Sequence, residues 1–148
     1  MADKIMNIAV IGCSGMASSH MRGICAKEGV KLYAICDPAQ ERLAQRKEEF
    51  GVEIAVADYR ELVNDPNVDA VVIVVPDKLH LPMTRDFLKA GKAVLLVSTE
   101  LSEILRLSDR IAVFFKGRCM KVLDRAEANV DQIGMLMMGL SDDQEVQA

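Results

Sequence analysis

A repeated alternation of short apolar runs with helical patterns constrains the fold of this chain most. Three times a helical pattern ends at a glycine, and an apolar run begins one or two residues later. This spacing is typical of βαβ units, in which a helix crosses over between two parallel strands. Because such crossovers are right-handed, the sequence predicts a doubly wound, mostly parallel α/β sheet in three layers. The expected strands are residues 5–11, 31–36, 53–57, 68–75 and 93–97.

The pattern changes after Ser98. A helix is expected over residues 100–108, with Ser98 or Thr99 as its N-cap. Lys116-Gly117 then separates two short apolar runs, which indicates a β-hairpin. The hairpin strands and a closing Met-rich helix are expected at residues 110–115, 118–123 and 126–140. No low-complexity linker intervenes, so we expect one domain over residues 1–148 with one continuous sheet.

The overall composition argues against several functional classes. The net charge of −4, from 18 Lys and Arg against 22 Asp and Glu, does not favour a nucleic-acid-binding surface. No apolar run approaches the roughly 18 residues that cross a bilayer, and the first residues do not read as a signal peptide. We therefore expect a cytoplasmic protein without membrane insertion. The four cysteines never stand at Cys-x-x-Cys spacing, which favours reduced thiols and no metal site.

The segment with the clearest chemistry lies between the first strand and the first helix, at residues 12–17. A dinucleotide-binding turn needs a tight bend, close backbone approach to the pyrophosphate and close helix packing. Gly12 suits the bend and Ala17 the packing, whereas Ser14 replaces the usual middle glycine and offers a hydroxyl to a phosphate. Helix N-termini also favour anions. The pyrophosphate is therefore expected on the backbone of Gly12, Cys13, Ser14, Gly15 and Met16.

Asp37 ends the second strand, 20 residues after Ala17. A carboxylate there accepts the hydroxyls of an adenosine ribose and repels a 2′-phosphate, so the predicted cofactor of this Rossmann-like sheet is NAD rather than NADP. The alternative is that the turn binds nothing, as in many α/β proteins. A helix N-terminus can lower the pKa of a thiol, but without a basic partner in sequence we expect Cys13 to be structural.

Six segments occur in a recognisable order, at residues 8–17 with His20, 34–38, 58–63, 68–73, 76–80 and 88–92. Together they resemble the N-terminal half of the Gfo/Idh/MocA-like oxidoreductases, over residues 5–95. The resemblance implies an NAD-binding domain in which the loop from Pro76 to His80 lies beside the cofactor's ribose and nicotinamide. The alternative is that Pro76 only ends a strand and that His80 is a surface residue.

The chain departs from that family after the fifth strand. The family continues with Glu-Lys-Pro, whose lysine contacts cofactor and substrate, whereas Ser98-Thr99-Glu100 stand here. The family's substrate domain, with its acid–base histidine, has no counterpart in the sequence. No catalytic residue is therefore assigned. We expect a module that binds NAD without turnover on its own; if it is active, the resemblance implies an NAD-dependent oxidoreductase.

Residues 91–104 and 107–113, with Gly117-Arg118 and the closing helix, form a second set. Over residues 91–140 they resemble the C-terminal end of the ATP-binding protein of a sugar- or nucleoside-importing ABC transporter. The Walker A loop, signature sequence and Walker B carboxylates have no counterpart, so ATP hydrolysis is not expected. The two resemblances meet near Gly91, which suggests a chimera, natural or engineered, or a mis-assembled gene.

Three hypotheses therefore stay open at this level. The leading one makes residues 1–97 a dinucleotide-binding part and residues 98–148 an ABC-ATPase-like extension. The others are a ligand-free recombined scaffold and a remnant oxidoreductase subunit whose site is completed by dimerisation. The helix that carries Met135, Met137 and Met138 is expected to pack in the core. A homodimer through that helix or through an edge strand is the alternative.

Overall fold

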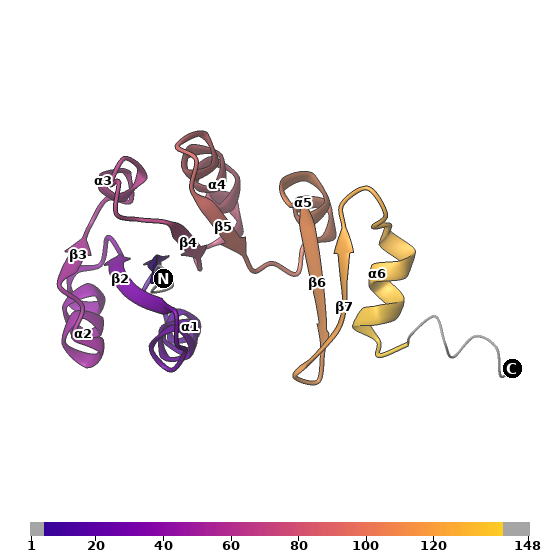
Figure 1. The fold of residues 1–148 in the computed structure, drawn as a ribbon, viewed down its shortest axis with the longest axis horizontal. Coiled ribbons are helices and arrows are strands. Elements are labelled where there is room, and N and C mark those ends of the chain that lie inside the picture. Colours follow the sequence, from indigo (N-terminus) through magenta and orange to yellow (C-terminus); the bar gives the residue numbers. More distant parts are fainter. Residues whose placement is uncertain (1–4, 141–148) are drawn as a thin grey trace, which may run out of the picture. The chain divides into compact units, whose positions relative to one another are not determined.

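The computed structural model describes residues 5–140. The chain forms two compact units, Met1–Val97 and Ser98–Ala148. The first contains a five-stranded parallel sheet in the order β3-β2-β1-β4-β5 (Figure 1). Its strands are β1 (Met6–Ile11), β2 (Val30–Cys36), β3 (Ile54–Val56), β4 (Ala70–Ile73) and β5 (Ala93–Leu96). The predicted doubly wound, parallel α/β fold is confirmed.

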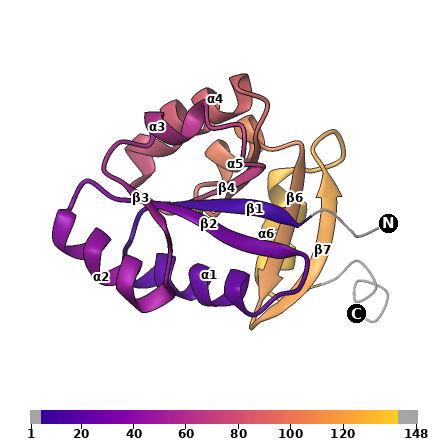
Figure 2. The same ribbon diagram turned by 60° about the vertical axis from the view of Figure 1, so that its left-hand side comes forward.

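Helices cover both faces of this sheet, which gives the expected three layers (Figure 2). They are α1 (Gly15–Cys25), α2 (Gln40–Phe50), α3 (Arg60–Val63), a 3₁₀ helix η1 (Asp77–Leu79) and α4 (His80–Lys89). On one face, Met21 of α1 and Leu43 of α2 belong to the core cluster that includes Val10 of β1. On the other face, Leu62 of α3 and Phe87 of α4 belong to a second cluster. Alternate residues of β1, β3 and β4 therefore supply the two cores.

The strand order places a topological switch point between β1 and β4. The chain proceeds from β1 outward to β2 and β3, then returns to pair β4 with the other side of β1. The hydrogen-bonded ladder continues past the strand ends: Gly12 N–H donates to the Cys36 carbonyl at 2.7 Å, and Val74 N–H donates to the Ile11 carbonyl at 2.8 Å. In open α/β sheets ligands bind in the crevice at this point, outside the carboxyl ends of the strands.

The second unit has its own sheet. It consists of α5 (Leu101–Leu107), β6 (Arg110–Phe115), β7 (Arg118–Asp124) and α6 (Val130–Met137), with β6 and β7 paired antiparallel. The expectation of one continuous sheet is wrong, because β6 and β7 form a separate two-stranded sheet. Ile111 and Val113 of β6 pack in one cluster with Ile133 and Leu136 of α6, so the hairpin buries its apolar face within its own unit. A single domain over residues 1–148 stays a prediction.

Two helix starts in the second unit differ from the sequence expectation. Glu100, rather than Ser98 or Thr99, is the N-cap of α5, because Ser98 Oγ accepts the Glu100 N–H at 3.0 Å in a turn that precedes the helix. The last helix begins at Val130 instead of residue 126. There the Asp124 carbonyl holds a turn, and Asn129 caps the helix by accepting the Gln132 N–H at 2.8 Å.

Candidate functional site

Gly12 forms the tight turn that follows β1. Its φ is +101°, a backbone conformation that side-chain-bearing residues rarely adopt. A Cβ placed there would lie 2.1 Å from the Val74 carbonyl oxygen, so the turn also packs directly against the backbone after β4. Ala17, one turn into α1, is fully buried in the cluster that contains Val10 and Cys13. Close packing of helix and strand at this turn is thus a property of the structure.

The N-terminus of α1 follows this turn and has unpaired donors. Ser14 is the N-cap, and its Oγ accepts the Ala17 N–H at 3.3 Å. Within the described part of the chain, the backbone N–H groups of Gly15 and Met16 have no hydrogen-bond partner. Ser14, Gly15 and Met16 are all exposed. The first turn of α1 therefore offers accessible N–H groups and the positive end of the helix dipole to an anion.

Asp37 joins the loop after β1 to the loop after β2. Its Oδ2 accepts the Cys13 N–H at 2.9 Å, and its Oδ1 accepts the Ala39 N–H at 2.8 Å and an Arg42 N–H at 3.1 Å. Burial acts to raise the pKa of this carboxyl group, but the two backbone hydrogen bonds and Arg42 outweigh it and hold the pKa below the ordinary value of 3.8. Asp37 is therefore a buried carboxylate with three donors already in place.

Cys13 has the surroundings of a structural residue. Its side chain is fully buried, and burial followed by the neighbouring Asp37 charge raises the pKa of its thiol to about 11. The protonated Sγ lies 3.9 Å from the Cys36 carbonyl oxygen. A thiol needs a lowered pKa to act as a nucleophile near neutral pH. The expected structural role of Cys13 agrees with this environment.

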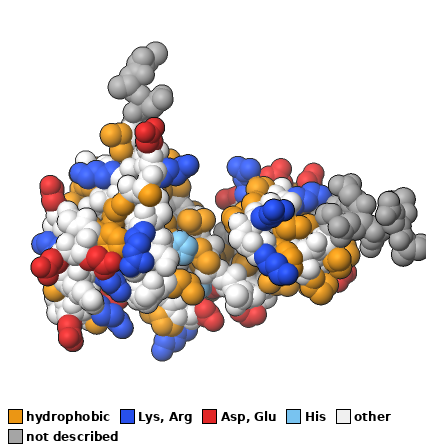
Figure 3. Space-filling model, turned by 90° about the horizontal axis from the view of Figure 1, so that it is seen from below, with side chains coloured by type: hydrophobic (Ala, Val, Ile, Leu, Met, Phe, Trp, Pro, Cys, Tyr) orange, Lys and Arg blue, Asp and Glu red, His pale blue; other side chains and the backbone are white. Residues whose placement is uncertain are grey.

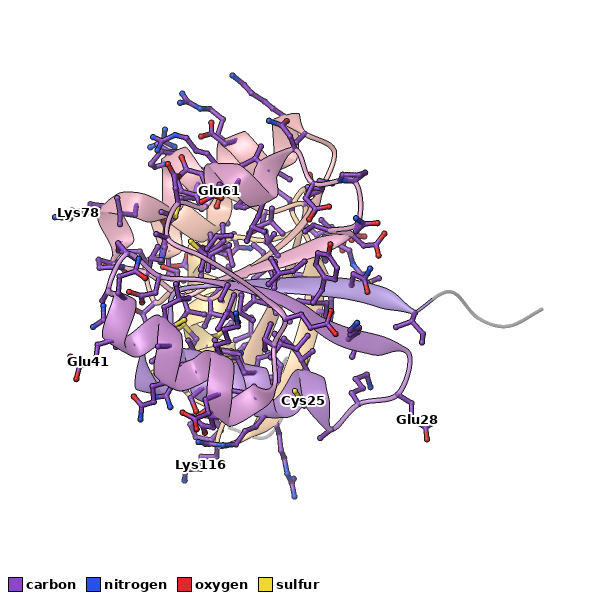
Figure 4. All side chains as sticks on the ribbon, turned by 90° about the vertical axis from the view of Figure 1, so that its left-hand side faces the viewer. Cys25, Glu28, Glu41, Glu61, Lys78 and Lys116 are labelled. Carbon is purple, nitrogen blue, oxygen red and sulfur yellow. The ribbon has the colours of Figure 1, made fainter. Side chains whose placement is uncertain are left out.

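The loop after β4 lies at the same end of the sheet as the β2–α2 loop. Figure 4 shows Glu41, at the start of α2, and Lys78, in η1, at this end, with Cys25 and Glu28 at the opposite end. Pro76 is exposed and precedes η1, whereas His80 is 3% exposed and its Nε2 lies 2.8 Å from the Val75 carbonyl oxygen. The alternative that His80 is a surface residue is wrong, because its ring anchors the loop.

Two arginines on α2 belong to this site and do not emerge from the sequence motifs. Arg42 pairs with Asp37, and Arg46 Nε donates to the Cys13 carbonyl at 3.4 Å while its guanidinium also pairs with Glu49. They stand one helical turn apart. Arg42 reaches the end of β2, and Arg46 reaches the turn after β1. One signal in the sequence could have indicated Arg42: a basic residue in the first turn of a helix opposes the dipole unless an acid lies nearby.

The other classes of site find no support in residues 5–140. These residues contain no group of three metal-ligating side chains, and no helix among them is long and apolar enough to cross a membrane. All four cysteines are free thiols. On the face shown in Figure 3, basic and acidic side chains are interspersed over each unit.

The strand order, the tight turn at Gly12 and the donors at the start of α1 define a Rossmann-type nucleotide-binding domain. The sequence model of an oxidoreductase family with an NAD-binding Rossmann fold, GFO_IDH_MocA, matches residues 6–110. The chain belongs to this Gfo/Idh/MocA oxidoreductase family. The first of the expected resemblances is thereby confirmed, and the family's cofactor agrees with the predicted one, NAD.

Individual relatives locate the similarity in one part of much longer proteins. Myo-inositol 2-dehydrogenase of Thermotoga maritima is 38% identical over 89 residues, which are 60% of this chain and 27% of that protein. The crystal structure of scyllo-inositol dehydrogenase from Lactobacillus casei, with bound NAD(H) and scyllo-inositol, has a TM-score of 0.60 and 32% identity, over 63% of this chain and 28% of that one. This chain thus spans a little over a quarter of each.

A further relative, from a different class of protein, is an ATP-binding protein for import. The guanosine import ATP-binding protein NupO of Bacillus subtilis is 54% identical over 50 residues, which cover 34% of this chain and 10% of that protein. The expected resemblance to an ABC ATP-binding protein is found over this short segment.

Proposed function

We propose that this chain binds NAD(H) in the crevice at the carboxyl ends of β1, β2 and β4. The observation that carries the proposal is Gly12, which leaves no space for a Cβ at the switch point and leads directly into the free N–H groups of α1. Within residues 12–16, the free N–H groups at the start of α1 bind the pyrophosphate, because the Gly12 and Cys13 N–H groups already donate to the Cys36 carbonyl and to Asp37. Pro76 with His80 flanks the nicotinamide side. NAD supplies a hydride-accepting ring; the chain's own residues bind and orient it.

Asp37 retains capacity for one ribose hydroxyl. An ionised carboxylate accepts about four hydrogen bonds, and three donors already occupy Asp37. A second ribose hydroxyl would compete with Arg42 for Oδ1. The carboxylate therefore fits the adenosine ribose and at the same time holds the loop that carries the pyrophosphate donors.

Titration with NADH, followed by nicotinamide fluorescence, tests this proposal. Saturable binding is expected, and Asp37→Ala should weaken it by one to two orders of magnitude, because hydrogen bonds to a charged group contribute roughly 1.5–3 kcal/mol. Asp37→Asn keeps the shape of the side chain and one acceptor oxygen, so it should lose less NADH affinity than Asp37→Ala. Absence of saturation up to millimolar NADH in the folded wild-type chain refutes the proposal.

We further propose that the chain alone does not turn over a substrate. Among residues 5–140 we assign no acid–base pair beside the nicotinamide side of the crevice, and His80, the nearest candidate, is buried against Val75. The polyols named in the two dehydrogenase relatives are the substrates to test. NAD reduction at 340 nm with myo-inositol or scyllo-inositol should equal the rate without protein; a rate that scales with protein concentration refutes this statement.

The C-terminal unit is proposed to descend from an ABC ATP-binding protein and to be joined to the NAD-binding unit as a chimera. The similarity to NupO and the separate two-stranded sheet support this origin.

The last helix offers a surface to a second copy of the chain. Ile133 and Leu136 of α6 are buried, whereas Met137 and Met138 are exposed. We propose that the chain forms a homodimer through this helix, and sedimentation velocity tests it. A monomer at all concentrations refutes both the homodimer and the hypothesis of a site completed by dimerisation.

A further inference from the structure

Arg42 lies where the adenosine ribose of the proposed cofactor would be bound. It stands in the first turn of α2, and one of its terminal N–H groups reaches back to Asp37 Oδ1 at 3.1 Å. Among the described residues Asp37 is its only polar partner, and its side chain is 57% exposed. A guanidinium carries five N–H donors in a fixed fork. Most of these donors therefore face solvent beside the carboxylate that the ribose requires.

The charge of Asp37 is already compensated in this arrangement. A lone carboxylate at the end of β2 repels a 2′-phosphate, which is the usual basis for excluding NADP. Here two backbone N–H groups and a guanidinium surround the carboxylate. The neighbouring acid, Glu41, points away from the sheet into solvent (Figure 4). The net charge of the Asp37–Arg42 pair is zero, so the main electrostatic objection to a 2′-phosphate is removed.

We propose that Arg42 is a specificity-determining residue that lets this site accept the 2′-phosphate of NADP(H) as well as the free ribose of NAD(H). The inference rests on the proposed function and refines it. With NAD(H), the Asp37–Arg42 pair stays closed and the remaining lone pair of Asp37 accepts a ribose hydroxyl. With NADP(H), the guanidinium turns its free N–H groups to the phosphate, whose geometry suits bidentate contact.

The test compares two coenzymes on the wild-type chain and on two variants of Arg42. NADH and NADPH are titrated by fluorescence into the wild-type chain, Arg42→Ala and Arg42→Lys. The wild-type dissociation constants should differ by less than tenfold. Arg42→Ala should raise the ratio of the NADPH constant to the NADH constant by roughly 10- to 100-fold, the value of a charge-assisted hydrogen bond. Arg42→Lys keeps the charge and should restore part of this loss.

Arg22→Ala is a matched control. Arg22 makes the same kind of pair, 3.1 Å from Glu49 Oε1 with a side chain 63% exposed, but it lies in the last turn of α1. Its removal should leave the ratio of the two constants unchanged. Far-UV circular dichroism and a thermal melt show that each variant is folded.

The outcomes separate this inference from the proposed function. If NADH binds and NADPH is weaker by tenfold or more, or if Arg42→Ala leaves the ratio unchanged, the role of Arg42 is refuted while NAD binding stands. An equal loss of affinity for both coenzymes in Arg42→Ala also refutes the role of Arg42 in specificity, because Arg42 then only positions the loop. If neither coenzyme binds, the proposed function fails and this inference fails with it.

Discussion

Replacing Gly12 with Ala tests how the turn at the switch point is built. The new Cβ would lie 2.1 Å from the Val74 carbonyl oxygen and 3.0 Å from its carbon, and φ at this position is +101°. A non-glycine residue in such a conformation costs about 1–3 kcal/mol. Relief of the clash requires a shift of backbone rather than of a flexible side chain, and overpacking of this kind costs about 1–3 kcal/mol more. The expected loss of stability is therefore about 2–6 kcal/mol, a large part of the roughly 5–15 kcal/mol of a typical domain.

Gly15→Ala provides the matched control three residues away. Nothing lies within 4 Å of a Cβ built at Gly15, which is the first residue of α1 and has no left-handed φ. Alanine in a helix reduces the entropy of the unfolded chain relative to glycine, so this variant should be neutral or up to about 1 kcal/mol more stable. The two substitutions add the same methyl group within one short segment, and they differ in the local backbone conformation and in the space around the new Cβ.

Urea denaturation followed by far-UV circular dichroism measures both variants, because the chain contains no Trp and its two Tyr are weak probes. A lower midpoint at unchanged slope is expected for Gly12→Ala. The reasoning is refuted if Gly12→Ala lies within about 0.5 kcal/mol of the wild type, the range of an ordinary surface substitution. It is equally refuted if Gly15→Ala is the more destabilising of the two.

Two further predictions concern ionisation near the site. The pKa of Asp37 is lowered in the folded chain, so its contribution to stability is fully present above the ordinary value of 3.8 and is lost as pH falls through the lower folded value. Asp37→Asn should therefore reduce the loss of stability between neutral pH and pH 3, as measured by urea titration. A pH profile identical to that of the wild type would contradict this. Burial raises the thiol pKa of Cys13 to about 11 and of Cys36 to about 12, whereas Cys25 and Cys119 are exposed. A disulfide reagent at pH 8 should therefore modify the two exposed thiols at once and the two buried thiols only in urea. Rapid modification of all four thiols in the native chain would contradict this and would show that the loop around Cys13 opens freely.

Local signals in the sequence determined most of the first unit. The apolar runs and the glycines after the helices predict the parallel sheet, because strand burial and helix termination depend on neighbours close in sequence. The turn at Gly12 and the packing of Ala17 follow from the same local pattern, and the structure has both. The boundary between the two sheets did not follow. The hairpin of β6 and β7 is predicted and is present, but whether it also extends the first sheet depends on contacts within the second unit, such as Ile111 with the α6 cluster.

The partners of Asp37 show the corresponding limit for the site. Its position at the end of β2 is predictable, but its bonds to Cys13 and Arg42 join segments 24 and five residues away through the fold. The expected preference for NAD over NADP treated Asp37 as an isolated charge. Arg42, a neighbour that no motif includes, compensates that charge, so the electrostatic basis of the preference cannot be derived from the motif alone.

The same contacts determine what the variants of Asp37 measure. Asp37→Ala removes the proposed ribose acceptor, but it also releases the Cys13 N–H and leaves Arg42 without its counter-charge. A loss of NADH affinity in this variant therefore reports both the proposed ribose contact and the position of the loop proposed to bind pyrophosphate. Asp37→Asn separates them, because its amide oxygen can still accept the Cys13 N–H while the anionic charge is gone. If Asp37→Asn has the thermal midpoint of the wild type but the weak NADH affinity of Asp37→Ala, the charge of Asp37 acts on the cofactor. If both the midpoint and the NADH affinity match the wild type, Asp37 acts chiefly by holding the loop.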